Sequence, residues 1–438
     1  MVDQSNEQEF VGTLSAEGLK WPLTLSAILS KDGELDLDFP SLPYNNETVE
    51  IQRLWNNDRG TVRDFAFEGI SANGERITSQ WLRFSKMGIR SDEEGDFLTI
   101  SGRFAKVILT KPAVTPYAKP FVRQLLRNCE GFRLLRVESP LGSVVFRGSH
   151  DIESPRALTG ILEIVGPEDI DNQVAWRREA ELLLLHVRQI MSFAMAQVIK
   201  VPLIQMGADG YFEQTIWSET DGGRVGQPLI HYLDQTAMFE TAVSSFFDPA
   251  IPAKGLSFAM EWFAMPARYT EMRLLHALTA LENLVEENLG EEDSFFLREG
   301  RFETLSKAMR RALDSLIEGE AEGVFRRGLA SKMRDLNRRT LFEKAMLLVE
   351  RWGVSLESFV PADLKAAIKA RDLIVHRGRY YEDAAGSPEQ PSLWDHILIV
   401  RELVARMIFT ALGFKGSYLC FIGGQHTRTW PPGGGTTT

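Results

Sequence analysis

The sequence has few of the residues that build covalent or metal-stabilised scaffolds. Of its 438 residues, two are cysteine, Cys129 and Cys420, and seven are histidine. Two cysteines cannot make a disulfide framework or a four-cysteine zinc site. The sequence also contains no Gly-rich phosphate loop, no H-E-x-x-H and no G-x-S-x-G. The common signatures of phosphate-binding loops, zinc peptidases and serine hydrolases are therefore excluded.

Long apolar runs are absent as well. A membrane-spanning helix needs about 18 or more consecutive apolar residues, and even the strongly apolar segment 396–409 is interrupted by Arg401, Glu402 and Arg406. The first ten residues, MVDQSNEQEF, contain neither the basic segment nor the apolar core of a signal peptide. We therefore expect no membrane partner and a cytoplasmic location.

Basic residues are outnumbered by acidic ones. The chain holds 49 Lys and Arg against 60 Asp and Glu, a formal net charge of −11, which by itself argues against a nucleic-acid partner. Residues 1–100 hold 9 of the basic and 18 of the acidic residues, which leaves 40 and 42 for the remaining 338. Alternating acids such as Glu34, Asp36 and Asp38 are typical of a solvated sheet face. The excess of acidic residues therefore lies almost entirely in the N-terminal region, and the rest of the chain is close to neutral.

The pattern of apolar residues predicts an α+β multidomain protein. Short alternating runs separated by turn signals predict strands over residues 9–110, in a β-sandwich or a similar sheet structure. We expect a β-rich N-terminal region at 1–150 and a bridging α/β segment at 151–251 that belongs to the same module. A helical domain is expected at 252–424 and a flexible tail at 425–438.

Individual elements are predicted inside these regions. Residues 48–55 are expected to form a strand and residues 119–128 a short helix. A long apolar helix is expected at 172–199, and another helix at 230–246. The C-terminal region is expected to form an all-α bundle of five helical segments with short connections. These segments are 265–290, 301–317, 331–353, 361–378 and 392–414.

The segment with the clearest chemistry is residues 370–379, ARDLIVHRGR. An Arg followed by a His after four to six residues occurs twice, as Arg371 with His376 and as Arg224 with His231, which is about as often as chance predicts. The spacing alone therefore decides nothing. The context favours the first pair, because it lies on the penultimate predicted helix, has an acidic residue directly after the Arg and is flanked by further basic residues.

Basic residues gather on two predicted helices of this region. On the helix of the motif they are Lys365, Lys369, Arg371, Arg377 and Arg379. Before it they are Arg326, Arg327, Lys332, Arg334, Arg338 and Arg339, with Asp335 as the one acid among them. Two basic helices in an acidic protein are a candidate phosphate-binding face. The alternative is a solvated helix flank in which Arg and Glu pair at i,i+4.

The C-terminal region resembles HEPN domains in its helical order, in Glu282 on its long first helix and in the RDLIVH motif of residues 371–376. The hallmark of these domains is Arg, a polar residue, three to five further residues and His. Asp372 fills the polar position, where Asn is commonest in related sequences. The succession of β-rich region, long bridging helix and C-terminal HEPN domain is similar to ApeA-type prokaryotic proteins.

This resemblance implies a metal-independent endoribonuclease without a cofactor. It would act as a homodimer through the HEPN domain, with two motifs facing each other across the interface. The partner would be RNA, with tRNA as one candidate, and the role would be antiviral (phage) defence or abortive infection. The N-terminal region would sense a trigger ligand or regulate the nuclease.

The resemblance also implies roles for individual residues. His376 would be the general base or acid, since imidazole titrates near neutrality. Arg371 would stabilise the phosphorane oxygens through its bidentate fork, and Asp372 would orient the imidazole. The RNA 2′-OH would attack, which gives a 2′,3′-cyclic phosphate and a 5′-OH. The residues expected to bind RNA are Arg377, Arg379, Lys369, Arg334, Arg338 and Arg339.

Helix geometry limits these roles. Asp372 and His376 are four positions apart and share a face, but Arg371 lies about 140° from His376 around a regular helix. Three arrangements could bring the last two together. The helix could fray at Gly378, Arg371 could curl round on its long side chain, or a second protomer could complete the site.

Alternatives to the nuclease remain open at this level. The bundle could be a non-catalytic binding or dimerisation module, or the protein could be a ligand-sensing interaction protein. His376 could be an inert histidine at a helix C-terminus. Tyr380 and Tyr381 could stack on bases or pack under the following loop.

Overall fold

The computed structural model describes residues 7–30, 32–56, 65–112, 117, 119–129, 134–149, 157–208, 210–218, 226–316, 332–333, 335–378, 380 and 391–433. The chain divides into two compact units. Unit 1 comprises Met1–Met191, Val198–Arg224 and Ala242–Phe246. Unit 2 comprises Ser192–Gln197, Val225–Thr241 and Phe247–Thr438. Unit 1 contains a large β-sheet and unit 2 is mainly helical, so the α+β multidomain class is confirmed.

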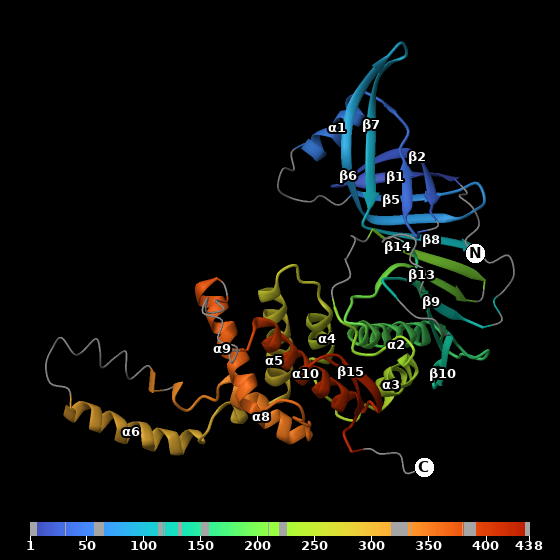
Figure 1. Cartoon of the computed structure of the whole chain (residues 1–438). Coiled ribbons are helices and arrows are strands. Elements are labelled where there is room, and N and C mark those ends of the chain that lie inside the picture. The colour runs from blue at the N-terminus through green and yellow to red at the C-terminus, as the bar shows by residue number, and fades with distance from the viewer. Residues whose placement is uncertain are drawn as a thin grey trace. The chain divides into compact units, whose positions relative to one another are not determined.

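The strands of unit 1 belong to one 14-stranded sheet (Figure 1). They are β1 (Glu7–Ala16), β2 (Leu19–Leu29), β3 (Leu35–Asp38), β4 (Leu42–Pro43), β5 (Phe65–Ile70), β6 (Arg76–Asp92), β7 (Gly95–Phe104), β8 (Lys106–Pro112), β9 (Phe121–Arg127), β10 (Leu134–Ser139), β11 (Gly142–Gly148), β12 (Gly160–Val165), β13 (Lys200–Ala208) and β14 (Tyr211–Trp217). The strand order is β10-β11-β12-β9-β13-β14-β8-β6-β5-β1-β2-β3, with β7 between β4 and β6 outside this path. Every pairing between these strands is antiparallel, for example β1 with β2 and β9 with β13.

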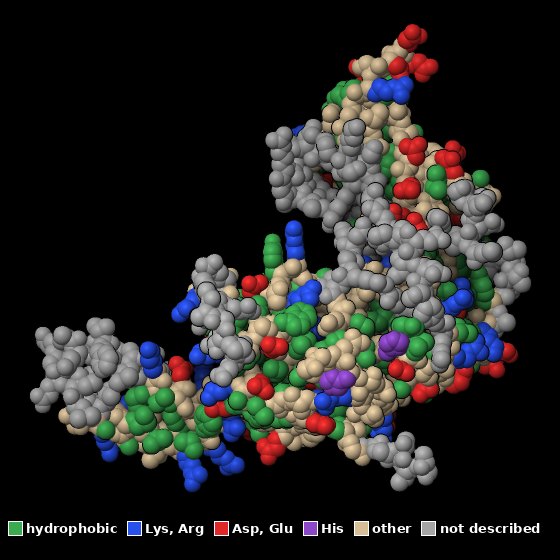
Figure 2. Space-filling view, in the orientation of Figure 1, with side chains coloured by type: hydrophobic (Ala, Val, Ile, Leu, Met, Phe, Trp, Pro, Cys, Tyr) green, Lys and Arg blue, Asp and Glu red, His purple; other side chains and the backbone are tan. Residues whose placement is uncertain are grey.

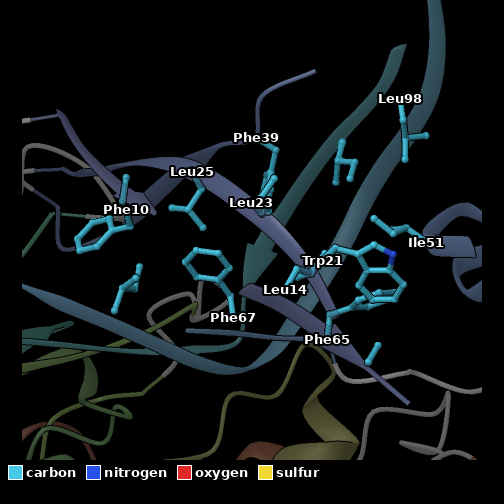
Figure 3. Close-up of a cluster of buried hydrophobic side chains, with 14 of the residues drawn as sticks. Phe10, Leu14, Trp21, Leu23, Leu25, Phe39, Ile51, Phe65, Phe67 and Leu98 are labelled. Carbon is cyan, nitrogen blue, oxygen red and sulfur yellow. The ribbon is translucent and has the colours of Figure 1, made fainter. Parts of the chain in front are cut away.

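Unit 1 has a hydrophobic core on one face of its N-terminal strands, called the first core below, and the alternation of apolar and polar residues explains it. In β2, Trp21, Leu23 and Leu25 are buried, and the residues between them are exposed. Side chains of successive strand residues point to opposite faces, so this alternation buries one face only. Phe10 and Phe67 come to the same face from β1 and β5 (Figure 3). The predicted pattern of half-buried strands is confirmed here.

Residues 48–55 form a helix, α1 (Asn46–Asn56), so the predicted strand is wrong. The Asn45 side chain accepts hydrogen bonds from the backbone N–H groups of Glu47 and Thr48, which is an N-cap. Ile51 and Leu54 are buried at helical spacing and join the first core. The β-branched residues Thr48, Val49 and Ile51 suggested a strand, but the cap and the three-residue spacing of Ile51 and Leu54 decide the structure.

Residues 119–128 are the second wrong prediction, because this segment contains strand β9 and no helix. β9 lies between β12 and β13 in the sheet. Val122, Gln124, Leu125 and Leu126 are all buried. A strand that is covered on both faces shows no alternation, and a short apolar run then cannot be told from a buried helix by its periodicity.

The remaining helices are α2 (Gln173–Ala194), α3 (Gln235–Phe247), α4 (Leu256–Ala264), α5 (Thr270–Asn288), α6 (Glu299–Leu316), α8 (Leu341–Trp352), α9 (Pro361–Arg377) and α10 (Leu393–Leu412), with a short 3₁₀ helix at Glu291–Ser294. In unit 2, α10 packs against α4, α5, α8 and α9 (Figure 1). Fifteen of its twenty residues are buried, as expected of a helix that is covered on most sides. Among the helices of the described residues, none combines the length and the apolar character that crossing a membrane requires.

The predicted single helix over 331–353 is interrupted in the structure, because Lys332, Met333 and Asp335 are helical but residues 336–340 are not. α8 begins after Thr340, whose side chain accepts a hydrogen bond from the Glu343 backbone, while the Glu343 carboxylate accepts one from the Thr340 backbone. This capping box satisfies two N–H groups that would otherwise lack partners at the helix start. Residues 336–340 before it form turns and an isolated bridge between Phe295 and Arg338.

The start of the predicted flexible tail at 425 is also corrected. Residues His426–Trp430 form β16, which pairs antiparallel with β15 (Gly416–Cys420). Trp430 is 5% exposed and its ring lies near those of Tyr418 and Phe409. Burial of this large side chain anchors the hairpin to unit 2.

Candidate functional site

The Arg371–His376 motif lies on the last two turns of α9. The helix runs from Pro361 to Arg377, and Gly378 with its positive φ of 76° forms a left-handed C-cap after it. The Gly378 N–H donates to the Ile374 carbonyl at 2.8 Å. α9 is therefore helical through both motif residues, and fraying at Gly378 does not bring them together.

Arg371 is held by an acidic residue on a neighbouring helix. Its Nη2 lies 2.8 Å from Oε1 and 2.9 Å from Oε2 of Glu282 on α5. The two side chains are 29% and 31% exposed, so the guanidinium retains an accessible edge. The ion pair fixes the cation against α5, and the side chain does not curl round toward His376. Glu282 was part of the sequence resemblance, but the sequence did not indicate its pairing with Arg371.

His376 lies on a different face of α9 and is exposed. Asp372 and Arg377 are exposed too, and no hydrogen bond or ion pair joins His376 to another residue in the described part of the chain. The expected contact between Asp372 and His376 is thus not formed, although their spacing places them on one face. Val375 beside them is 59% exposed. The outer face of the last turns is therefore uncovered by the described residues of this chain.

The residues expected to bind RNA do not form one described cluster. Lys369 is exposed on α9. Arg338 is exposed and lies 4.0 Å from Asp335. Arg339 donates from Nε to the Phe295 carbonyl and its guanidinium lies over the Phe296 ring, which indicates a structural role. Arg334 and Arg379 lie outside the described residues.

Two further sequence candidates occupy other places. His231 lies in the connection before α3 with its ring against Tyr232, and Arg224, its counterpart in the second match, lies outside the described residues. Tyr380 meets the buried His396 edge-on, with ring centroids 5.9 Å apart, which is the packing alternative for this tyrosine. Burial lowers the pKa of His396 below its usual value. Tyr381 is not among the described residues.

A second group of charged residues, which sequence reasoning missed, lines a small open pocket in unit 2. Arg273 and His276 come from α5, and Trp394 and Arg401 come from α10. The available signal was Arg401 itself, an arginine within the strongly apolar segment 396–409.

Acidic side chains in the described ranges are scattered and do not gather into a metal-binding group. Figure 2 shows Asp and Glu at separate places over the N-terminal strands, and Asp36 and Asp38 are exposed, as a solvated sheet face requires. Within the described ranges, no three His, Cys, Asp or Glu side chains are grouped closely enough to hold a metal ion.

The geometry of α9 presents a fixed cation and, on another face, an exposed imidazole. Imidazole can transfer protons near neutrality and a guanidinium can bind phosphate oxygens. Among the described residues of one chain, Arg371 and His376 do not lie together. If both act on one substrate, a second chain or the substrate itself must bring them together. Comparisons of this chain with protein-family models, with curated proteins and with solved structures gave no match.

Proposed function

We propose that the protein is a metal-independent endoribonuclease of the HEPN type, with unit 2 as its helical HEPN domain and α9 as the helix that carries the active site. The observation behind this proposal is the placement of the motif. The ion pair with Glu282 holds Arg371 against α5, while His376 remains exposed at the end of the same helix. This arrangement supports the proposal because the cation is held in place and the imidazole is accessible to a substrate.

The chemistry needs only proton transfer and charge stabilisation. His376 accepts the proton of the RNA 2′-OH as its oxygen attacks the adjacent phosphorus. Arg371 stabilises the negative charge that develops on the phosphorane oxygens. The 5′-oxygen leaves with a proton from a general acid, which gives a 2′,3′-cyclic phosphate and a 5′-OH. Exposed Lys369 and Arg377 bind the flanking phosphates through charge attraction.

A homodimer completes the site in this proposal. Arg371 and His376 lie about 140° apart around α9, and neither helix fraying nor the Arg371 side chain closes that gap. Val375, Asp372 and His376 are all exposed on these last turns of α9. A second α9 packed on these turns would bury Val375 and place the Arg371 of one chain near the His376 of the other.

The biological role follows the same resemblance. A nuclease that attacks cellular RNA needs control, and a β-rich unit on the same chain is suited to sense a trigger. We propose antiviral defence or abortive infection as the process and unit 1 as the regulatory part.

The test is RNA cleavage by the purified full chain in EDTA, with end-group analysis of the products. His376→Ala should lower the cleavage rate by about 100-fold or more, and Arg371→Ala by a similar factor. His231→Ala removes the histidine of the other Arg–His match, so this control variant should retain activity. Full cleavage by either motif variant, with intact folding, would refute the site assignment.

Mixing the two inactive variants tests the dimer. If Arg371 of one chain acts with His376 of the other, a heterodimer of Arg371→Ala and His376→Ala contains one complete site. The mixture should then recover cleavage after subunit exchange. A mixture that stays inactive, with heterodimers shown by native mass spectrometry, would place both groups of a site on one chain.

A non-catalytic binding or dimerisation module is the second candidate. The observation in its favour is that His376 has no partner among the described residues and Arg371 is already paired. This function predicts RNA or partner binding without cleavage under every condition. Binding that survives His376→Ala, together with no 2′,3′-cyclic product from the unaltered protein, would support it.

A further inference from the structure

The pocket between α5 and α10 contains a partly buried arginine, Arg401, without a counter-charge. Nη1 of Arg401 donates to the Phe263 carbonyl at 3.0 Å, and its guanidinium lies 3.8 Å from the centre of the Phe263 ring. Nη2 is enclosed and has no hydrogen-bond partner. No carboxylate forms an ion pair with Arg401 in the described part of unit 2.

Arg401 nevertheless stays charged at neutral pH. Burial and the nearby positive charge of Arg273 lower its pKa to about 10. This is well above neutrality, so deprotonation does not relieve the unpaired charge. Proteins normally pair a buried charge, because removing it from water without a partner is costly.

The rest of the pocket wall also favours a negative ligand. Arg273 supplies a second cation and lies over the Trp394 ring, with 5.7 Å between the guanidinium carbon and the ring centre. Nδ1 of His276 is buried without a hydrogen-bond partner, but burial lowers the pKa of this imidazole, so the ring is neutral and the positive charge of the wall comes from the two arginines. Two guanidinium groups and an unused ring nitrogen thus line one pocket. None of these three side chains takes part in the α9 site.

We infer that this pocket binds a tetrahedral phosphate group, either free or as the phosphate of a nucleotide. The planar fork of arginine matches phosphate oxygens with two parallel hydrogen bonds. A phosphate would give Nη2 of Arg401 its missing acceptor and would neutralise the repulsion between Arg401 and Arg273. A neutral solute would do neither. This inference concerns a site separate from α9 and does not depend on the nuclease proposal.

The experiment measures binding to the full chain by isothermal titration calorimetry and by thermal melting at constant ionic strength. Inorganic phosphate, AMP and adenosine are the probes. Phosphate should raise the melting temperature more than chloride does. AMP binding with no adenosine binding identifies a nucleotide phosphate, and phosphate binding without AMP binding identifies the free ion. If neither phosphate nor AMP binds, the inference is wrong.

Variants locate the binding. Arg273→Gln removes the partly exposed cation and should weaken the affinity at least about tenfold, as expected for a lost charge-assisted hydrogen bond. Arg401→Lys keeps a charge inside the fold, removes the fork and should weaken binding as well. Arg268→Gln, an exposed arginine just before α5 and outside the pocket, should bind like the unaltered protein. Equal affinities for Arg273→Gln and Arg268→Gln would refute the site even if phosphate binds. RNA cleavage is not a readout, so this result is independent of the nuclease test.

Discussion

Glu402 and Arg406 show how a single buried pair supports unit 2. Arg406 Nε lies 2.8 Å from Glu402 Oε1, and the side chains are 1% and 4% exposed. The Tyr418 hydroxyl donates to the same oxygen at 2.7 Å. Nη1 of Arg406 donates to the carbonyls of Ser355 and Glu357. The network therefore joins α10 to the α8–α9 connection and to β15.

Loss of one partner should be costly. Glu402→Gln keeps the shape of the side chain but leaves Arg406 charged and without a counter-ion, so we expect the free energy of unfolding to fall by about 3 kcal/mol. Urea unfolding followed by circular dichroism measures it. Glu303 and Lys307 on α6 are a matched pair with the same i,i+4 spacing and a 2.8 Å contact, but they are 63% and 66% exposed. Glu303→Gln should leave the free energy of unfolding unchanged. If Glu402→Gln and Glu303→Gln lower it equally, burial is not the reason that the Glu402–Arg406 pair matters.

The sequence located the α9 motif but did not reveal its surroundings. RDLIVH is a local pattern, so Arg371 and His376 could be singled out and their separation around the helix predicted from spacing. The Glu282 partner is 89 positions away from Arg371, and a long-range contact of this kind has no signature in a single sequence. Arg401 was similarly visible only as a break in an apolar segment, because its lack of a counter-ion depends on what α4 and α5 place around it.

At the scale of the element, α8 depends on its start signal. The Thr340–Glu343 capping box satisfies two backbone N–H groups. Thr340→Ala removes the side-chain acceptor and should lower the free energy of unfolding by about 1 kcal/mol, while Thr340→Ser should retain most of it. Thermal melting of the three proteins measures the effect.

Thr304→Ala is the control for this prediction. Thr304 is exposed within α6, and its hydroxyl donates to the Gly300 carbonyl of its own helix. Alanine is the better helix former there, so the substitution should not destabilise the protein. A loss for Thr304→Ala as large as that for Thr340→Ala would show that the cap is not the cause.

The elements that the sequence predicted correctly are those with a local cause. β2 alternates apolar and polar residues, and α10 is a long apolar segment with a Gly stop at Gly413. The errors have causes of two kinds. A local signal was overlooked at Asn45 and at Thr340, where caps start α1 and α8. At β9 no local signal existed, because its run of apolar residues reflects burial on both faces of the sheet, which depends on distant parts of the chain.

At the scale of the molecule, the helical unit draws on segments far from the C-terminal region. Ser192–Gln197 and Val225–Thr241 belong to unit 2. The Phe193 ring lies 4.9 Å from that of Phe263 and 5.7 Å from that of Phe409, centre to centre. The Leu419 N–H donates to the Leu229 carbonyl at 2.7 Å. A chain that starts at residue 252, where the sequence predicts the helical domain to begin, lacks Phe193 and Leu229.

We therefore expect the fragment 252–438 not to fold cooperatively. Loss of one buried Phe side chain costs about 3–5 kcal/mol, which is a large part of the roughly 5–15 kcal/mol that stabilises a domain. The fragment should bind a hydrophobic dye and melt without a sharp transition. Adding Ser192–Gln197 and Val225–Thr241 through a short linker should restore the transition.

In the full chain, Phe193→Ala should lower the free energy of unfolding. Leu182→Ala on the same helix, where the side chain is 44% exposed, should have little effect. If fragment 252–438 melts cooperatively at the melting temperature of the full chain, Ser192–Gln197 and Val225–Thr241 are dispensable for folding. The core within 252–438 would then suffice to fold the helices that carry the α9 motif and the arginine pocket.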